Sequence, residues 1–316
     1  MSSSEHYSVL LHEAVDGLVT DIDGCYVDGT FGRGGHSKEI LKRLSPNGCL
    51  VAFDKDPRAI EAAKTFSSDE RFLIKHRSFA DLHNVVSGSE ELIKRFKRKD
   101  FLQGVLLDLG VSSPQLDDAG RGFSFMQDGP LDMRMDNSKG ICAKEWIADT
   151  SEEDMTWAFR EYGEERFAKR IARAIALVRA ERSIERTLDL AQIVKDANPR
   201  WEKHKHPATR VFQAIRIAVN EELDDLRRAL ESAVDCLRPG GRLVVISFHS
   251  LEDRIVKRFF RDLAKGQELP KGLPVMEDDL GKKLKLITKA IKASDGELKE
   301  NVRSRSAVMR IAERLA

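Results

Sequence analysis

The chain has 316 residues, of which 41% are hydrophobic and 33% are charged. That much apolar material can form a core, so a wholly disordered protein is excluded, and the length suggests two domains or one domain with an insertion. Lysine and arginine number 53 against 52 aspartates and glutamates, which gives a net charge of +1. The overall charge therefore indicates no particular partner.

The four cysteines lie far apart and form no C-x-x-C pair. This spacing argues against a disulfide framework and against a cysteine zinc site, and it fits a reducing compartment. No apolar run approaches the length of about 18 residues that a membrane span needs. The N-terminal MSSSEHYS has neither the basic nor the apolar region of a signal peptide. We therefore expect a cytoplasmic protein that does not associate with membranes.

Short apolar runs alternate with helical patterns along most of the chain. The runs predict strands over residues 25–30, 50–54, 72–76, 104–110, 242–248 and 306–312. The clearest helical patterns cover residues 57–66, 222–237 and 251–265. Continuous apolar strands separated by helices are typical of a parallel sheet covered on both faces. The expected fold class is α/β, with a Rossmann-like, mostly parallel sheet.

The alternation stops after Val111. Residues 112–140 are rich in glycine, aspartate, serine and proline, which predicts a long loop. A helical block follows, and one buried helix face is marked by Phe167, Ile171, Ile175 and Val178. We therefore predict a discontinuous core over residues 1–112 and 208–316, interrupted by a helical domain over residues 113–207.

A glycine-rich loop, DGTFGRGGHS (28–37), follows the first predicted strand. Its four glycines let the backbone pass close to a ligand, and ligands of open α/β sheets bind at the carboxyl ends of the strands. The spacing is not G-x-G-x-x-G, so the dinucleotide fingerprint is absent. A tight strand-to-helix turn remains the alternative for this loop.

Asp54 ends the second strand, where a carboxylate can accept hydrogen bonds from both hydroxyls of a ribose. Its alternative role is to cap the helix that starts at Pro57, for which Asp56 is the better candidate. A ribose is compatible with NAD or with S-adenosylmethionine (SAM). Asp28 favours SAM, because an acid beside the loop repels a pyrophosphate and suits an ammonium group. Phe79 follows the third strand and either packs on adenine or belongs to the core.

The fourth strand ends at Asp108 and is followed by Ser112-Ser113-Pro114-Gln115. Amino-directed nucleobase methyltransferases carry a polar motif with proline at this place. Ser113-Pro114-Gln115 resembles it in part, because the second proline and the aromatic residue are missing. We predict Asp108, Ser113 and Pro114 as catalytic candidates. Asp108 either receives a proton or only positions SAM, and a turn at the start of the insertion is the alternative for the motif.

Basic residues cluster in 94–99, 166–182 and 282–314. Several such clusters in a nearly neutral protein predict a surface that contacts RNA, with solvated faces as the alternative. No metal site is predicted, because no cysteine or third close histidine completes a ligand set with the candidates His204, His206 and His249.

The sequence closely resembles the bacterial ribosomal RNA small subunit methyltransferase H family, also called MraW. The resemblance rests on the stretches DGTFGRGGHS, DLGVSSPQLDDAGRGFSFMQDGPLDMRMD, YGEERFAKRIARAI, HPATRVFQAIRIAVNEEL and ISFHSLEDRIVKRF. It runs from about Tyr7 to Arg314 and is poor over residues 85–100 and 265–300. It implies a class I SAM-dependent methyltransferase with an inserted helical domain. The implied reaction is methylation of the N4 amine of a cytidine in the decoding region of 16S rRNA.

Matched residue by residue, the resemblance implies SAM contacts at Gly34, Gly35, His36, Asp54, Phe79, Asp108 and Gln115. It implies 16S rRNA in the small ribosomal subunit as the partner, and it leaves the oligomeric state open, a homodimer included. Two other functions stay open. A nucleotide-dependent oxidoreductase is disfavoured by the glycine spacing, and a non-catalytic RNA-binding or assembly factor is disfavoured by the intact loop, Asp54 and the SSPQ motif.

Overall fold

The computed structural model describes residues 8–316 except 88–89, 91, 93–101, 201–205 and 267–280. The chain divides into two compact units. Unit 1 comprises residues 1–110 and 224–316, and unit 2 comprises residues 111–223. The sequence placed the second boundary after residue 207, whereas α11 (Thr209–Asn220) belongs to unit 2.

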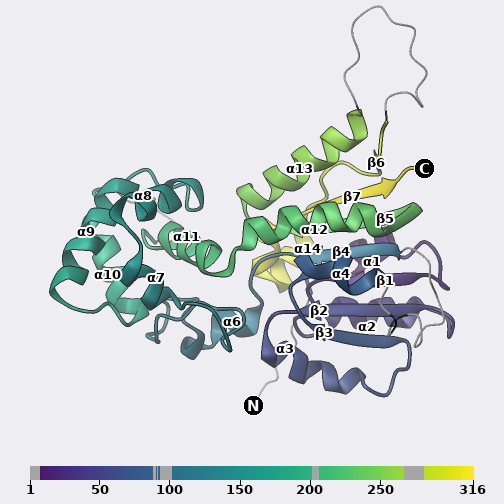
Figure 1. Cartoon of the computed structure of the whole chain (residues 1–316), viewed down its shortest axis with the longest axis horizontal. Coiled ribbons are helices and arrows are strands. Elements are labelled where there is room, and N and C mark those ends of the chain that lie inside the picture. Colours follow the sequence, from purple (N-terminus) through teal and green to yellow (C-terminus); the bar gives the residue numbers. More distant parts are fainter. Residues whose placement is uncertain (1–7, 88–89, 91, 93–101, 201–205, 267–280) are drawn as a thin grey trace, which may run out of the picture. The chain divides into compact units, whose positions relative to one another are not determined.

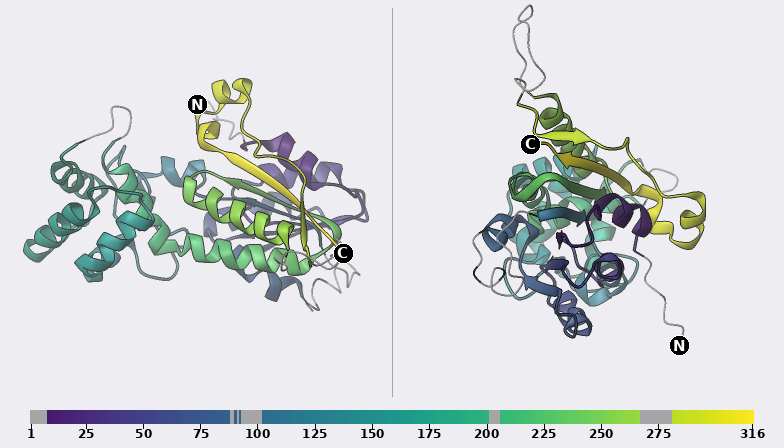
Figure 2. Two further views of the ribbon diagram at one scale, coloured as in Figure 1. Left: turned by 90° about the horizontal axis from the view of Figure 1, so that it is seen from above. Right: turned by 90° about the vertical axis from the view of Figure 1, so that its right-hand side faces the viewer.

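In the described part of unit 1, seven strands form one sheet with the order β3-β2-β1-β4-β5-β7-β6 (Figure 1). The strands are β1 (Cys25–Asp28), β2 (Cys49–Asp54), β3 (Phe72–His76), β4 (Leu102–Asp108), β5 (Leu237–Ser247), β6 (Leu284–Leu286) and β7 (Val308–Arg314). The first five are parallel, and β7 runs antiparallel to both of its neighbours, β5 and β6 (Figure 2). The predicted α/β class with a mostly parallel sheet is confirmed.

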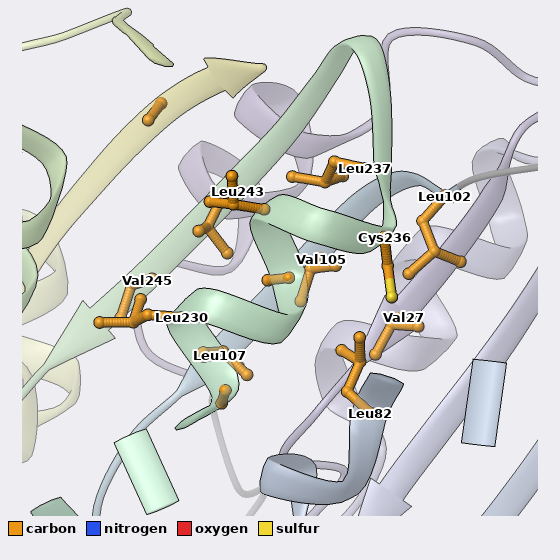
Figure 3. Packing of buried hydrophobic residues seen from close by; sticks show 14 of the residues in the cluster. Val27, Leu82, Leu102, Val105, Leu107, Leu230, Cys236, Leu237, Leu243 and Val245 are labelled. Carbon is orange, nitrogen blue, oxygen red and sulfur yellow. The ribbon is translucent and has the colours of Figure 1, made fainter. Parts of the chain in front are cut away.

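Helices cover both faces of this sheet. They are α1 (Leu11–Leu18), α2 (Gly35–Arg43), α3 (Pro57–Ala62), α4 (Leu82–Val86), α12 (Glu222–Cys236) and α13 (Ser250–Lys265). The short helix α14 (Asp295–Glu300) instead contacts the 3-10 turn η5 (Val302–Ser306). Alternate strand residues point to opposite faces, so Tyr26 joins the core under α1, α2 and α3, while Val27 joins the core under α4, α12 and α13. Figure 3 shows Leu230 of α12 beside Val245 of β5 on the second face. Burial on both faces explains the continuous apolar runs in the sequence.

Two predicted elements begin or end at other residues in the structure than the sequence predicted. The helix predicted over 57–66 is α-helical only as far as Ala62 and continues as the 3-10 turn η1 (Ala63–Phe66). Its cap is Asp56, as predicted, because the Asp56 side chain accepts the N–H of Arg58 at 2.9 Å. The strand predicted over 242–248 starts earlier, since β5 begins at Leu237 and includes the Pro-Gly-Gly segment 239–241.

Cys25 and Cys49 form a disulfide. They lie at paired positions of the parallel strands β1 and β2, with their Cα atoms 4.7 Å apart, which is within the range of disulfides. The sequence did not predict this pair, because the two cysteines lie far apart along the chain and only the strand register brings them together. Cys142 and Cys236 are free thiols.

Unit 2 is helical. Its helices are α6 (Ser113–Asp117), α7 (Ala143–Asp149), α8 (Glu152–Glu161), α9 (Ala168–Glu181), α10 (Thr187–Ala197) and α11 (Thr209–Asn220). The predicted face of α9 is confirmed: Ile171 and Ile175 are fully buried, and Phe167 and Val178 pack on the same core. No described helix in either unit is long and apolar enough to cross a lipid bilayer.

The predicted loop 112–140 contains α6 and a 3-10 turn, η3 (Ala119–Arg121), and otherwise lacks regular structure. Polar contacts hold it in place. The buried Arg121 donates to the carbonyls of Arg134 and Met135, and Asn220 of α11 donates to the carbonyl of Met133 at 2.7 Å. Loop and helix α11 therefore form one packed body within unit 2, which is why α11 does not belong to the sheet unit.

Candidate active site

The glycine-rich loop after β1 needs glycine at two adjacent positions. Gly34 has φ +77°, and a Cβ there would lie 2.7 Å from the rings of Phe31 and Phe66. A Cβ on Gly35, the first residue of α2, would lie 2.0 Å from the hydroxyl oxygen of Ser8. The loop thus brings bare backbone to the carboxyl ends of the strands, where ligands of such sheets bind.

Asp28, the last residue of β1, is fully buried beneath this loop. One carboxylate oxygen accepts the hydroxyl of Ser37 at 2.6 Å, and the other accepts the N–H of Thr30 at 3.1 Å. Burial raises the pKa of this carboxyl, against the lowering effects of the His36 charge and of these hydrogen bonds. Asp28 therefore supports the loop with both carboxylate oxygens, and its contact with an ammonium group stays a prediction.

Asp54, the last residue of β2, holds the same loop from the neighbouring strand. Its carboxylate accepts the N–H of Gly32 at 2.7 Å and the N–H of Asp56 at 2.8 Å. Burial raises the pKa of the Asp54 carboxyl to about 6, although both N–H groups lower it. Each carboxylate oxygen has a further lone pair, so Asp54 retains acceptor capacity for a pair of hydroxyls.

Phe79 starts the 3-10 turn η2 (Phe79–Asp81) that follows β3. Its side chain is half-buried against the core under α12, and a Cβ on Gly29 would lie 3.1 Å from the Phe79 Cβ. The Phe79 side chain therefore lies next to the glycine-rich loop. Like Asp54, it lies at the carboxyl ends of the parallel strands.

Asp108 ends β4 and completes the group of strand-end carboxylates. Its N–H donates to the hydroxyl oxygen of Thr30 at 2.7 Å, and its Oδ2 lies 3.6 Å from Nδ1 of the buried His36. Burial, with the charges of Asp28 and Glu252, raises the pKa of the Asp108 carboxyl well above its usual range. Its Oδ1 is buried and has no hydrogen-bond partner among the described residues. Of the three strand-end carboxylates, Asp108 alone has an oxygen without a hydrogen-bond partner in the part of the chain that the structure describes.

Ser113, Pro114 and Gln115 belong to unit 2, where they form the start of α6. The side chain of Gln115 accepts the N–H of Ser112 at 2.9 Å, and the two residues make a reciprocal capping box. The motif is thus a helix start in place of the loop that the sequence predicted. The approach of these three residues to the carboxylates of unit 1 stays a prediction.

Three contributors to the site were not singled out from the sequence: the Thr30 hydroxyl, the Ser37 hydroxyl and the carbonyl of Val9, which lies 3.2 Å from Nε2 of His36. Thr30 and Ser37 lie inside the quoted loop motif, so their polarity was a usable signal. Val9 is apolar, and no sequence pattern reports what its carbonyl binds. Of the three histidines weighed as metal ligands, His204 lies outside the described residues, His206 packs its ring on Phe125, and Nε2 of His249 lies 3.1 Å from Oε1 of Glu252.

The sequence of this chain matches a known family. The model of the MraW methylase family matches residues 3–315. This chain belongs to the MraW methylase family. Within it, the chain is 57% identical over 311 residues to the ribosomal RNA small subunit methyltransferase H of Chromohalobacter salexigens, covering 98% of this chain and 92% of that one. It is also 57% identical over 312 residues to the protein of the same name from Shewanella frigidimarina, covering 98% and 97%.

Among solved structures, a putative rRNA methylase from Clostridium thermocellum superposes with a TM-score of 0.44 at 10% identity, covering 98% of this chain and 99% of that one. Family membership makes the chain a SAM-dependent methyltransferase. The oxidoreductase that the glycine spacing already disfavoured is thereby excluded as its main activity.

Proposed function

We propose that this MraW-family protein transfers the methyl group of SAM to the N4 amine of a cytidine in the decoding region of 16S rRNA. The observation that carries the proposal is the match to ribosomal RNA small subunit methyltransferases over nearly the full length of the chain. Small ribosomal subunits are the expected substrate particle, and the cytoplasm is the expected location, because these subunits are there.

The described residues of unit 1 fit SAM. The glycine-rich loop has no room for side chains, so a ligand can approach its backbone closely. Asp54 has spare lone pairs for the hydroxyls of a ribose, and the unpartnered oxygen of Asp108 suits an ammonium group. We assign Asp54 to the ribose hydroxyls and Phe79 to the adenine. The backbone of Gly34, Gly35 and His36, with Asp108 and Gln115, completes the cofactor set.

The methyl transfer does not require a strong base. An exocyclic amine is a weak nucleophile because its lone pair is delocalised into the base, so groups that accept its two hydrogens help it to pyramidalise. The methylsulfonium of SAM supplies an electrophilic carbon with a good leaving group. Catalysis then depends on in-line positioning and on where charge is placed. The target cytosine must leave its stack to reach this geometry.

We assign the acceptor role to the backbone carbonyls around Ser112–Pro114, aided by the Ser113 hydroxyl. The amine nitrogen forms a bond to the methyl carbon as the carbon–sulfur bond breaks, and one N4 proton must then leave. Asp108 is the candidate to receive it, directly or through water. The alternative is that Asp108 only positions SAM, and both roles suit its unpartnered Oδ1.

For the RNA, we assign a basic face of α9 and the turn before it. Arg166, Lys169, Arg170 and Arg173 are exposed, and none of the four pairs with an acid within the described part of unit 2. Two other arginines are occupied: Arg179 of α9 donates to the carbonyl of Thr150, and Arg182, the residue after α9, pairs with Asp189. Unpaired cations along one helix face can neutralise RNA phosphates. The basic segment 94–99 lies outside the described residues.

The decisive experiment incubates the protein with isotope-labelled SAM and small ribosomal subunits that lack the modification, followed by nucleoside mass spectrometry. We expect label in N4-methylcytidine. A protein that binds the subunits but transfers no label would be the non-catalytic assembly factor, and label in another nucleoside would overturn the assigned target. SAM and NAD are compared by their effect on the melting temperature, which only SAM should raise.

A further inference from the structure

The imidazole of His36 lies between a backbone carbonyl and a carboxyl group. His36 is the second residue of α2 and is 4% exposed. Its Nε2 lies 3.2 Å from the carbonyl oxygen of Val9, and its Nδ1 lies 3.6 Å from Oδ2 of Asp108. Neither the glycine-rich loop nor the proposed chemistry explains why an ionisable ring is buried here.

The Val9 carbonyl fixes one ring proton. A carbonyl oxygen only accepts, so the contact with Nε2 requires a hydrogen on Nε2. A neutral ring would then turn the lone pair of Nδ1 toward Asp108, which is unfavourable against an ionised carboxylate. The distance from Nδ1 to Oδ2 is too long for a hydrogen bond but short enough for strong charge attraction at a buried site. The pair formed by His36 and Asp108 therefore holds a second proton, in addition to the one on Nε2.

The surroundings of the ring are acidic. Asp28 is close enough that the His36 charge lowers its pKa, and the charges of Asp28 and Glu252 raise the pKa of Asp108. The other elements packed against α2 are β2, which carries Asp54, and α1, whose ionisable side chains are all exposed: His12, Glu13 and Asp16. Arg33 and Lys38, on either side of His36 in the chain, are exposed to solvent. Of these groups, His36 is the buried one that can carry a positive charge.

We propose that His36 is a positioning residue: in the ligand-free protein it carries a proton on both ring nitrogens, and this charge favours the ionised form of Asp108, against burial and the neighbouring acids, so that the carboxylate can accept a hydrogen bond from the ammonium group of SAM. The SAM part of this inference rests on the proposed function. Without the imidazolium, burial and the neighbouring acids favour a neutral Asp108. Binding a cation would then require Asp108 to release a proton first.

The protonation state can be observed directly by 15N NMR of the ligand-free protein labelled at histidine, with the His36 signals assigned by their loss in His36→Gln. The two nitrogens of an imidazolium have similar shifts, whereas those of a neutral ring are widely separated. We expect the imidazolium pattern for His36 at pH 7.5, where a free histidine, with a pKa of about 6.5, is mostly neutral. A neutral ring at that pH would overturn the proposal, whether or not SAM binds.

Calorimetry tests the effect of His36 on SAM binding. At pH 7, His36→Gln should bind SAM about tenfold more weakly or worse, as expected when one charge-assisted hydrogen bond is lost. In buffers of different ionisation enthalpy, this variant should release close to one proton on binding SAM, and its affinity should rise toward pH 9. The wild type should release almost none. Lys38→Gln, which removes an exposed cation two residues away, should behave as the wild type.

A probe without the amino-acid end separates positioning from general damage. 5′-Methylthioadenosine lacks the ammonium group, so His36→Gln should bind it within about twofold of the wild type. If both ligands weaken equally, or if SAM binding by the variant releases no proton, His36 only supports the loop and the proposal is wrong. If the wild type does not bind SAM at all, the proposed function fails, while the NMR result still decides the state of His36.

Discussion

The carboxylate of Asp54 accepts the backbone N–H of Gly32 at 2.7 Å, so the end of β2 holds the loop that follows β1. The same carboxylate accepts the N–H of Asp56 at the start of α3. One side chain therefore sets two strand-to-helix connections and, in our proposal, also binds a ribose. Structural and binding roles must be separated in any test of this residue.

Asp54→Ala should weaken SAM binding about tenfold or more. The change removes the charged acceptor of the ribose hydroxyls, and such hydrogen bonds contribute roughly 1.5–3 kcal/mol. Isothermal titration calorimetry measures the effect on protein shown to be folded by its thermal transition. Asp56→Ala is the matched control, because it removes the cap of α3 but leaves its own N–H to Asp54. Unchanged SAM affinity in folded Asp54→Ala would remove the ribose role.

SAM affinity should depend on pH through Asp54. The pKa of this carboxyl is about 6 in the ligand-free protein, raised above its usual value by burial. Above pH 6 it is ionised and ready to accept the ribose hydroxyls, whereas below pH 6 the bound proton must be lost first. Affinity should therefore fall as the pH drops below 6, by up to about tenfold per pH unit. In Asp54→Asn, the part of the pH dependence of SAM affinity that Asp54 causes should be absent between pH 5 and pH 7.

Gly34→Ala should destabilise the fold more than Gly240→Ala. Both glycines have similar positive φ values, +77° and +79°, so each alanine meets a backbone cost of about 1–2 kcal/mol. A Cβ at Gly240 meets nothing within 4 Å, whereas one at Gly34 meets two phenyl rings at 2.7 Å. Overpacking adds about 1–3 kcal/mol at Gly34 alone. Urea unfolding of both variants gives the difference, and equal losses would contradict the crowding argument.

Charge reversal on α9 should weaken RNA binding and spare SAM binding. Arg170→Glu combined with Arg173→Glu removes two unpaired cations, so the slope of log affinity against log salt should shrink by about 1–2. Reversal of Arg303 and Arg305 tests the C-terminal basic segment in the same way. Lys257→Glu with Arg258→Glu, exposed on α13, is the control of equal charge change. RNA affinity that is insensitive to salt and to both test pairs would rule out these surfaces.

Asp108→Asn distinguishes proton transfer from SAM positioning. If the variant binds SAM normally but its single-turnover rate falls by on the order of 10²-fold, Asp108 handles the proton or the charge. If it binds SAM poorly and recovers the full rate at saturating SAM, the catalytic role must be abandoned. Single-turnover measurements with subunits in excess separate these outcomes from product release.

The sequence predicted the sheet well, because strands buried on both faces leave continuous apolar runs such as LVAFD. It placed the end of the insertion too early. The apolar face of α11 would suit either core, and only contacts such as that between Asn220 and Met133 show that the helix packs within unit 2.

At the site, Asp54 and Asp108 could be found from their places at strand ends. The hydrogen bond between Asp108 and Thr30 joins residues from separate strand ends, and the contact between His36 and Val9 involves a backbone atom. Neither leaves a pattern in the sequence. The Cys25–Cys49 disulfide was missed for the same reason, since strand register is a property of the folded sheet.

The division of unit 1 has a consequence for folding during synthesis. β4 and β5 are neighbours in the sheet, yet all of unit 2 lies between them in the chain. A nascent chain therefore finishes unit 2 while β4 is still an open edge with unpaired backbone groups, and β7, which covers β5, comes last. Such edges invite pairing with other chains. The half-made protein is thus most prone to aggregation at its central strand, for as long as unit 2 is being made.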